Sequence, residues 1–249
     1  MYVLHCKAIG ILVFVFTFPE VRAQLILPDY QLTGPGDPVQ LFHDDDTYPL
    51  VKFPAGYEQQ AKIALSYYPE LKGLKIRFRT KKGGAPFVSR PTVGSTFFKK
   101  PENRTYLIII RTGEDKRFGP ILMKNMPLNA QIGVLGHELA HTVDFAQRGL
   151  GKMMRVIWGN LSKKYMDEFE YNTDRSAIEH GLGFQILAWS RHASKTLRFN
   201  EPENPEANKK IAGIFQRERY MLPATIIKTM RELPLYEPHW PQLEQLVKD

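Results

Sequence analysis

The stretch Gly136-His137-Glu138-Leu139-Ala140-His141-Thr142-Val143-Asp144 contains a His-Glu-x-x-His pattern. Residues four apart share one face of a helix, so we expect His137 and His141 to point the same way, one turn apart. Two neutral imidazoles so placed can bind one Zn²⁺, and Glu138 beside them can act on a water molecule that the metal activates. A surface helix with two hydrogen-bonded histidines is the alternative, and the flanking sequence decides between the two.

Apolar residues at roughly helical spacing surround the two histidines, and they are Ile132, Val134, Leu135 and Leu139. The spacing predicts a helix that begins at about Ala130, has Asn129 as its N-cap and ends near Gly149. Three small residues lie close to the direction of the histidines and would let a second helix or strand approach closely: Gly133, Gly136 and Ala140.

The first residues, 1–23, have the pattern of a secretory signal peptide. Lys7 precedes an apolar run of eleven residues, 8–18, and the segment ends in Val21-Arg22-Ala23. We expect cleavage after Ala23 and a secreted or periplasmic protein. The run is too short to span a bilayer, so we expect no stable membrane insertion after cleavage, although an uncleaved anchor is the alternative.

Cysteine usage restricts the chemistry of the remaining chain. Cys6 is the only cysteine, and it lies inside the expected signal peptide. Cleavage therefore leaves no thiol for disulfides, nucleophilic catalysis or thiolate metal ligands. A metal must then be bound by histidine and carboxylate side chains.

The chain is basic, with a formal net charge of +8. Loss of Lys7, Arg22 and Glu20 with residues 1–23 lowers it by two and raises it by one, to +7. Lysine pairs are scattered along the chain and are not interleaved with aromatic residues, so we expect no nucleic-acid partner. A solvated basic surface is the simpler interpretation, and attraction to an anionic cell surface or an acidic substrate stays open.

Residues 24–54 are rich in Pro, Gly and Asp and predict an extended N-terminal arm. Asp44-Asp45-Asp46 lies within it, but the spacing and glycine of a calcium loop are absent, which favours a solvated acidic turn. A helix is expected from Tyr57 to Tyr68, and the alternation in residues 74–80 predicts a strand with one solvated face. We expect residues 55–249 to form one catalytic domain with a helical C-terminal extension.

Further strands are expected at residues 87–93 and 97–98 and, most clearly, in the β-branched run from Thr105 to Thr112. If this run formed the sheet edge beside the cleft, it could bind an extended peptide by strand addition. An ordinary core strand is an equally good interpretation.

Downstream, residues 158–160 predict a break and a helix cap, and a long helical pattern runs from Leu161 to about Ala193. Glu170 and Asp174 lie one turn apart on it, with small residues on nearly the same side. A carboxylate from a second helix is what the two histidines lack as a third ligand. A solvated acidic pair on a surface helix is the alternative.

The pair of motifs resembles the gluzincin metallopeptidases, the group of thermolysin and neprilysin, and Glu170-Tyr171-Asn172-Thr173-Asp174 is similar to the E-x-x-A-D segment of the CAAX prenyl proteases. The resemblance implies that His137, His141 and Glu170 bind zinc, that Glu138 is the catalytic base, and that Asp174 supports His137. It also implies that Asp144, as in H-E-x-x-H-x-x-D, orients His141. A metal-binding histidine generally donates a hydrogen bond from the ring nitrogen that does not bind the metal, and it needs an acceptor there.

The chain departs from the family pattern at two points. Thr173 replaces the usual alanine, and no counterpart of the residue that stabilises the oxyanion can be assigned. Tyr220, His180, Arg217 and Arg219 are candidates by chemistry; Tyr220 ranks first because His180 lies about 80° off the ligand face of an ideal helix. In the tail we expect helices at 207–220, at 223–233 and after Pro241.

Taken together, the sequence predicts an α+β, mostly helical, zincin-like metallopeptidase domain with a small mixed sheet beside the His-Glu-x-x-His helix. The expected activity is zinc-dependent hydrolysis of peptide bonds in a peptide or protein substrate. Two alternatives stay open. One is a zinc-stabilised binding or scaffold protein, and the other is hydrolysis of a non-peptide amide.

Overall fold

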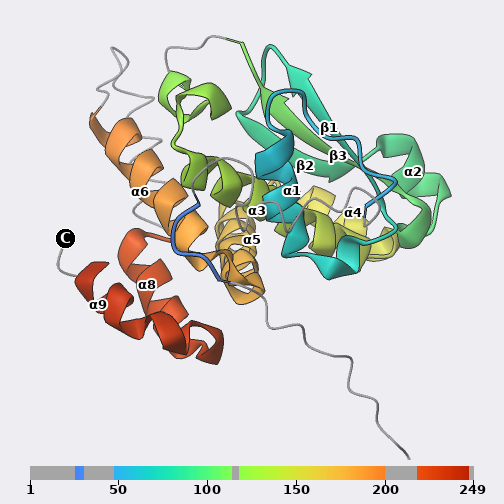
Figure 1. The fold of residues 1–249 in the computed structure, drawn as a ribbon. Helices are drawn as coiled ribbons and strands as arrows, with labels where there is room; N and C mark the ends of the chain where they lie inside the picture. Colours follow the sequence, from blue (N-terminus) through green and yellow to red (C-terminus); the bar gives the residue numbers. More distant parts are fainter. Residues whose placement is uncertain (1–25, 31–47, 114–117, 200–217, 247–249) are drawn as a thin grey trace, which may run out of the picture.

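The computed structural model describes residues 26–30, 48–113, 118–199 and 218–246. Figure 1 shows the described helices gathered around a small sheet. The expected signal peptide, the acidic turn at residues 44–46, Arg217 and nearly all of the helix expected at residues 207–220 lie outside the described residues. None of the helices in the described ranges has the length and the apolar character needed to cross a membrane.

The sheet has three strands in the order β1-β3-β2. β1 (Lys75–Lys81) pairs in parallel with β3 (Thr105–Arg111), and β2 (Phe87–Pro91) pairs with β3 in the antiparallel sense. β3 is therefore the central strand, so the core-strand interpretation of this run is confirmed and the edge-strand interpretation is wrong. The edge next to the metal-motif helix is formed by β2, which packs on that helix.

Residues 97–98, expected as a strand, belong to the short helix α2 (Val93–Phe98). Hydroxyl groups close this helical turn: the side chains of Ser95 and Thr96 both donate to the carbonyl oxygen of Thr92, at 3.0 Å each. Such local side-chain bonds compete with strand pairing, which explains why the strand prediction was wrong here.

Two helices expected from their periodicity are present, as α1 (Glu58–Ser66) and α3 (Leu128–Ala146). The N-cap of α3 is Pro127 and not Asn129. The Asn129 side chain instead accepts a hydrogen bond from the Tyr30 amide (3.0 Å) and donates one to the Tyr30 carbonyl (3.1 Å). It thus ties residues 26–30 to the first turn of α3.

The single long helix expected from Leu161 to Ala193 is instead two helices separated by a break. α5 (Lys163–Ala177) is followed by the π-helical turn η7 (Ile178–Leu182) and by α6 (Gly183–Phe199), and Gly181 inside the turn has φ +99°. The Tyr236 hydroxyl stabilises this break, because it accepts from the Gly183 amide (2.8 Å) and donates to the Ile178 carbonyl (2.6 Å).

The remaining elements are short and connect or cover those above. α4 (Leu150–Gly159) fills the link between α3 and α5, and Ser162, whose side chain accepts from the Tyr165 amide, caps α5. The C-terminal region comprises α8 (Pro223–Glu232), η8 (Pro234–His239) and α9 (Trp240–Leu246). Single 3₁₀ turns complete the chain: η3 (Pro69–Leu71), η4 (Pro101–Asn103), η5 (Gly119–Ile121) and η6 (Met123–Asn125).

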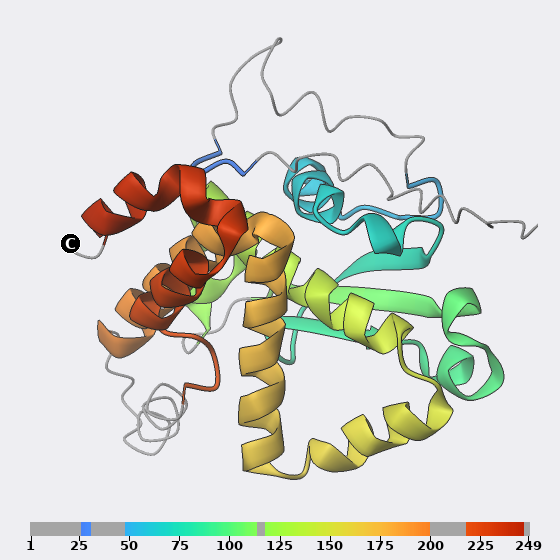
Figure 2. The same ribbon diagram turned by 90° about the horizontal axis from the view of Figure 1, so that it is seen from below.

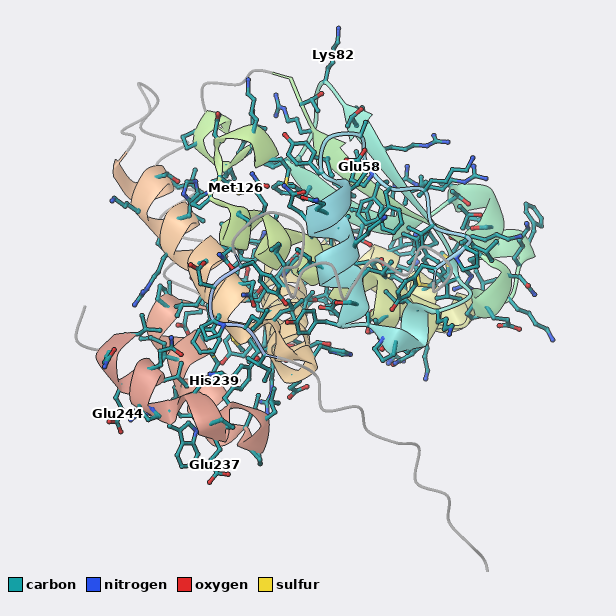
Figure 3. The ribbon with its side chains drawn as sticks, in the orientation of Figure 1. Glu58, Lys82, Met126, Glu237, His239 and Glu244 are labelled. Carbon is teal, nitrogen blue, oxygen red and sulfur yellow. The ribbon has the colours of Figure 1, made fainter. Side chains whose placement is uncertain are left out.

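α3 is the central helix, and Figure 2 shows it running between the sheet and α5. Its small residues do permit a close approach, but mainly by α6. A Cβ atom on Gly133 would lie 2.1 Å from the backbone oxygen of Gln185, and one on Gly136 would lie 2.4 Å from the Leu182 side chain. α8 packs against α6 and against the π-helical turn η7. Glu237 and Glu244 project outward from the C-terminal region in Figure 3.

Candidate metal centre

Three side chains from two helices converge at the middle of the molecule. The Nε2 atoms of His137 and His141 on α3 lie 3.1 Å and 3.2 Å from the same oxygen of Glu170 on α5. The possible ligand atoms of the three residues all lie within 4.8 Å of one another, and all three side chains are buried or nearly so. His137, His141 and Glu170 therefore form a group that could hold a metal ion, as the sequence predicted.

The hydrogen bonds behind the two rings determine which nitrogen carries the proton. His137 Nδ1 lies 2.7 Å from Asp174 Oδ1, so it donates there. The Thr173 hydroxyl donates to the carbonyl of Phe169 (2.8 Å) and therefore accepts from His141 Nδ1 (3.2 Å). Each Nε2 atom then presents a lone pair to the same carboxylate oxygen of Glu170, and three acceptors this close together need a proton or a metal cation between them.

The pKa values agree with this interpretation. Burial by itself would raise the pKa of Glu170, but the two histidines hold it far below its usual range. Burial would lower the pKa of His137, yet Asp174 and Glu170 raise it well above its ordinary value. Without a metal the group thus holds on to a proton, and a divalent cation would provide the positive charge instead.

The role expected for Asp144 is wrong. Its two carboxylate oxygens accept hydrogen bonds from Arg148 Nε (2.6 Å) and Nη2 (2.7 Å), one helical turn further on. The far nitrogen of His141 is bound by Thr173, the residue at which the chain departs from the family pattern. Phe169 also packs on the His141 ring, with 4.9 Å between the centroids. Asp174, in contrast, does bind His137 as expected.

Thr173→Val is accordingly expected to weaken zinc binding by about tenfold or more, whereas Asp144→Asn should leave it unchanged. Valine has the shape of threonine but offers no acceptor to His141, and it leaves that ring free to turn or to exchange its tautomer. Competition with a coloured zinc chelator measures both affinities. Equal affinities for the two variants, or a larger loss for Asp144→Asn, would contradict the assignment.

Glu138 lies next to the three possible ligands and outside their group. It is buried, and its Oε2 atom has no hydrogen-bond partner among the described residues. Burial raises the pKa of Glu138, the nearby His141 and His137 oppose the rise, Glu170 adds to it, and a hydrogen bond from the backbone of Ser89 on β2 opposes it. A buried carboxylate with one free oxygen and a raised pKa is suited to accept a proton near neutral pH.

Glu138 and His137 line a cavity of about 260 Å³ together with Tyr220 and Asp174. The rest of its wall is mostly apolar and comes from β2 and its preceding turn, from η5 and from α6: Pro86, Phe87, Ile121, Trp189, Ala193 and Leu197. One possible metal ligand, His137, and the carboxylate residue Glu138 thus line the same largely apolar pocket.

Tyr220 is the oxyanion candidate that the structure brings to this site, with its ring 5.8 Å from that of His137. Hydrogen bonds hold the segment that carries it: the Met221 amide donates to Asp174 Oδ2 (2.8 Å), and Ser190 donates to the Met221 carbonyl (2.8 Å). Burial and the surrounding carboxylates raise the pKa of Tyr220 well above its ordinary value, so its hydroxyl stays protonated and can donate.

Two of the other candidates lie in different surroundings. His180 binds Glu70 and the Ser176 carbonyl, and Arg219 forms an ion pair with Asp167 at 2.6 Å. Thr173 and Ser89 also contribute to the site, and neither was predicted from the sequence. Thr173 was open to inference, since it precedes Asp174 and follows Glu170 by three residues on one helix face. Nothing local to Ser89 indicates its backbone bond to Glu138.

Comparison with known proteins adds no relative: no protein-family model, no curated protein and no solved structure matches this chain. The interpretation of the site therefore rests on its own geometry.

Proposed function

We propose that this chain is a zinc-dependent metallopeptidase, exported as its first residues lead us to expect. The observation that carries the proposal is the convergence of His137, His141 and Glu170 next to Glu138, which has an unpartnered oxygen and lines a cavity together with His137. Two imidazoles and one carboxylate are a common protein ligand set for catalytic zinc, which keeps a further position for water or substrate. The ligand set supports zinc over the harder cations, which prefer oxygen ligands alone.

Each residue then has a distinct part. A bound zinc ion would supply Lewis-acid chemistry, lowering the pKa of a water molecule and polarising the scissile carbonyl. Glu138 takes the proton of the attacking water and passes it to the leaving amine. Tyr220 donates a hydrogen bond to the oxyanion that develops on the carbonyl. Asp174 orients His137 and, through the Met221 amide, holds the segment that presents Tyr220.

The free edge of β2 supports an extended peptide as substrate. The antiparallel bonds Arg111 N to Pro86 O and Thr92 N to Thr105 O fix which residues of β2 face β3. Pairs alternate along such a ladder, so Phe87 and Ser89 direct their backbone groups away from β3. The Ser89 backbone already binds Glu138, so a substrate strand would pair at Phe87, which lines the cavity. A substrate strand can add to this edge by main-chain hydrogen bonds.

The apolar wall of the cavity bears on the two alternatives. A hydrolase for a polar non-peptide amide needs polar groups along its substrate, while this cavity is suited to a large apolar side chain beside the scissile bond. A scaffold protein needs zinc but neither a free carboxylate nor a hydroxyl donor beside it. Glu138 and Tyr220 both line the cavity, which favours the enzyme.

The test of the proposal combines metal content and cleavage. We expect about one zinc per chain by elemental analysis, and cleavage of a random peptide library next to apolar residues, with both lost on chelation. A protein that binds zinc but cleaves no peptide would favour the alternative of a zinc-stabilised binding or scaffold protein. A protein that takes up no zinc would overturn the whole assignment.

Tyr220→Phe is expected to lower kcat by about 10²-fold while zinc content and melting temperature stay nearly unchanged. The ring, which provides the packing, is retained, and only the donor to the oxyanion is lost. Steady-state kinetics on one cleaved peptide measures the effect. A rise in KM with kcat unchanged, or a parallel loss of zinc, would show that Tyr220 does not stabilise the oxyanion.

A further inference from the structure

Exposed apolar side chains are concentrated at one end of the molecule. Nine large apolar residues in the described ranges are exposed, and seven of them belong to α2, α4 and the residues directly after α4. α2 and α4 contact each other, and Figures 1 and 2 place them at the same end in both views. Exposed apolar side chains gathered on neighbouring elements in this way mark a place where another molecule binds.

On α4 the exposed residues share one helix face. Leu150, Ile157 and Trp158 stand at positions i, i+7 and i+8, and Leu161 continues their direction just beyond the helix end. Trp158 is 66% exposed and Leu161 80%, while Met153 and Val156, on the adjoining flank of the helix, are buried in the core. α4 therefore carries one broad apolar stripe, of which one flank is buried in the core and the other is exposed to solvent.

α2 adds a second set of protruding side chains beside this face. Val93 and Phe97 lie one turn apart and are both exposed, and Phe98 is 88% exposed, the highest value among the large apolar residues described. Ser95 and Thr96 form the buried side of the same helix. Together the exposed apolar residues of α2, of α4 and of its end are called the apolar patch below.

Cations surround the apolar patch. Lys99 and Lys100 follow Phe98 directly, Lys152 and Arg155 lie on α4, and Lys163 and Lys164 begin α5 after Leu161. All six are exposed, and none of them forms an ion pair within the part of the chain that the structure describes. The acidic residues nearby are few, and Asp144 and Asp167 among them are already paired with arginines.

We propose that the apolar patch binds the surface of a bilayer that contains anionic phospholipid. Trp, Phe and Leu side chains that enter the boundary between headgroups and acyl chains, with lysines around them at the level of the phosphates, are the pattern of interfacial binding. A protein partner would equally cover the apolar residues but gives no reason for six unpaired cations around them. The binding is peripheral and does not require the zinc site.

The position of the patch relative to the zinc site follows from α5. Lys163 and Lys164 lie in the first turn of this helix, and Glu170 lies two turns further along it, about 10 Å away by helix rise. A protein held at a membrane by the apolar patch thus keeps the site within about 10–15 Å of the headgroups, where membrane-attached chains can reach it.

Cosedimentation of the full chain with vesicles tests the proposal. We expect binding to vesicles of phosphatidylcholine mixed with phosphatidylglycerol, and little binding to phosphatidylcholine alone. Two double variants, Trp158→Ser with Leu161→Ser and Lys163→Glu with Lys164→Glu, should each lower the binding constant by at least ~10-fold. Both alter exposed residues, and acidic residues in the first turn of α5 suit the helix dipole, so the fold is retained.

Matched controls separate the patch from general surface effects. Trp240→Ser changes an exposed tryptophan elsewhere, and Lys75→Glu with Arg79→Glu reverses two exposed cations on β1. Both controls should bind within about twofold of the unmodified chain. Residues 1–25 are common to all variants, so binding through them would leave every variant alike and would overturn the proposal.

Fluorescence gives a local measurement. Phosphatidylcholine brominated in its acyl chains should quench part of the tryptophan emission, and this quenching should vanish in Trp158→Ser and persist in Trp240→Ser. Light scattering without vesicles measures whether the chain forms a dimer. A dimer that Trp158→Ser dissociates would show that the apolar patch is a contact between two copies and would overturn the membrane assignment, as would equal binding to neutral vesicles.

Discussion

Glu138→Gln is expected to keep its zinc and to lose peptide hydrolysis by at least ~10²-fold. Glutamine has the shape of glutamate but cannot accept the proton of the attacking water. The carboxylate is buried with an unpartnered oxygen, and burial raises its pKa, so replacement by a neutral amide should leave the melting temperature unchanged or slightly higher. The proposed metal ligands are His137, His141 and Glu170, so zinc content should stay near that of the unmodified protein.

The measurement compares zinc content and cleavage of one peptide library by both forms in parallel. Glu168→Gln, an exposed glutamate on α5, is the matched control and should cleave like the unmodified protein. If Glu138→Gln cleaves normally, the residue is not the base. If neither form cleaves anything while both bind zinc, a zinc-stabilised binding protein replaces the peptidase.

The possible metal ligands could be predicted because their geometry is local. Two histidines four apart on a helix share a face whatever the rest of the fold, and the third ligand had to come from a second segment with a carboxylate and small neighbours. Glu170 met that requirement, and the structure places its oxygen between the two rings. The alternation in β1 and the periodicity of α3 were likewise visible from the residues alone.

Other features depend on contacts between residues far apart in sequence and were missed or wrongly predicted. The break between α5 and α6 is stabilised by Tyr236, more than fifty positions away, whose hydroxyl binds two backbone groups at the π-helical turn. The order of the strands, which puts β2 and not β3 beside the cavity, also follows only from the assembled sheet. Local periodicity carries no information on either feature.

The residues that support the possible metal ligands could be predicted from the sequence only in part. Asp174 was expected to bind His137 and does so, but its second oxygen also accepts from the Met221 amide, which no sequence pattern indicates. This bond explains why Tyr220, chosen by chemistry alone, lies at the site. The error on Asp144 has a local cause, because Arg148 one turn further on competes for its carboxylate.

Glu170→Ala is expected to lose most of the bound zinc, whereas Glu168→Ala should keep it. The two glutamates are two positions apart, which turns their side chains about 200° from each other on α5, and only Glu170 faces the histidines. With one ligand removed, two imidazoles hold the metal far more weakly. Elemental analysis after dialysis against zinc-free buffer measures the difference, and the reverse pattern would overturn the choice of third ligand.

Stability measurements distinguish a metal ligand from a merely structural carboxylate. A bound ion stabilises only the folded state that presents all its ligands, so the melting temperature of the unmodified protein should fall on chelation. Glu170→Ala should melt near the chelated protein and should not change further when chelator is added. Loss of the proton that Glu170 shares with His137 in the metal-free state adds a fall that does not depend on chelator, so the response to chelator is the decisive measurement. An equal fall caused by chelator in Glu170→Ala and in the unmodified protein would mean that the metal lies elsewhere.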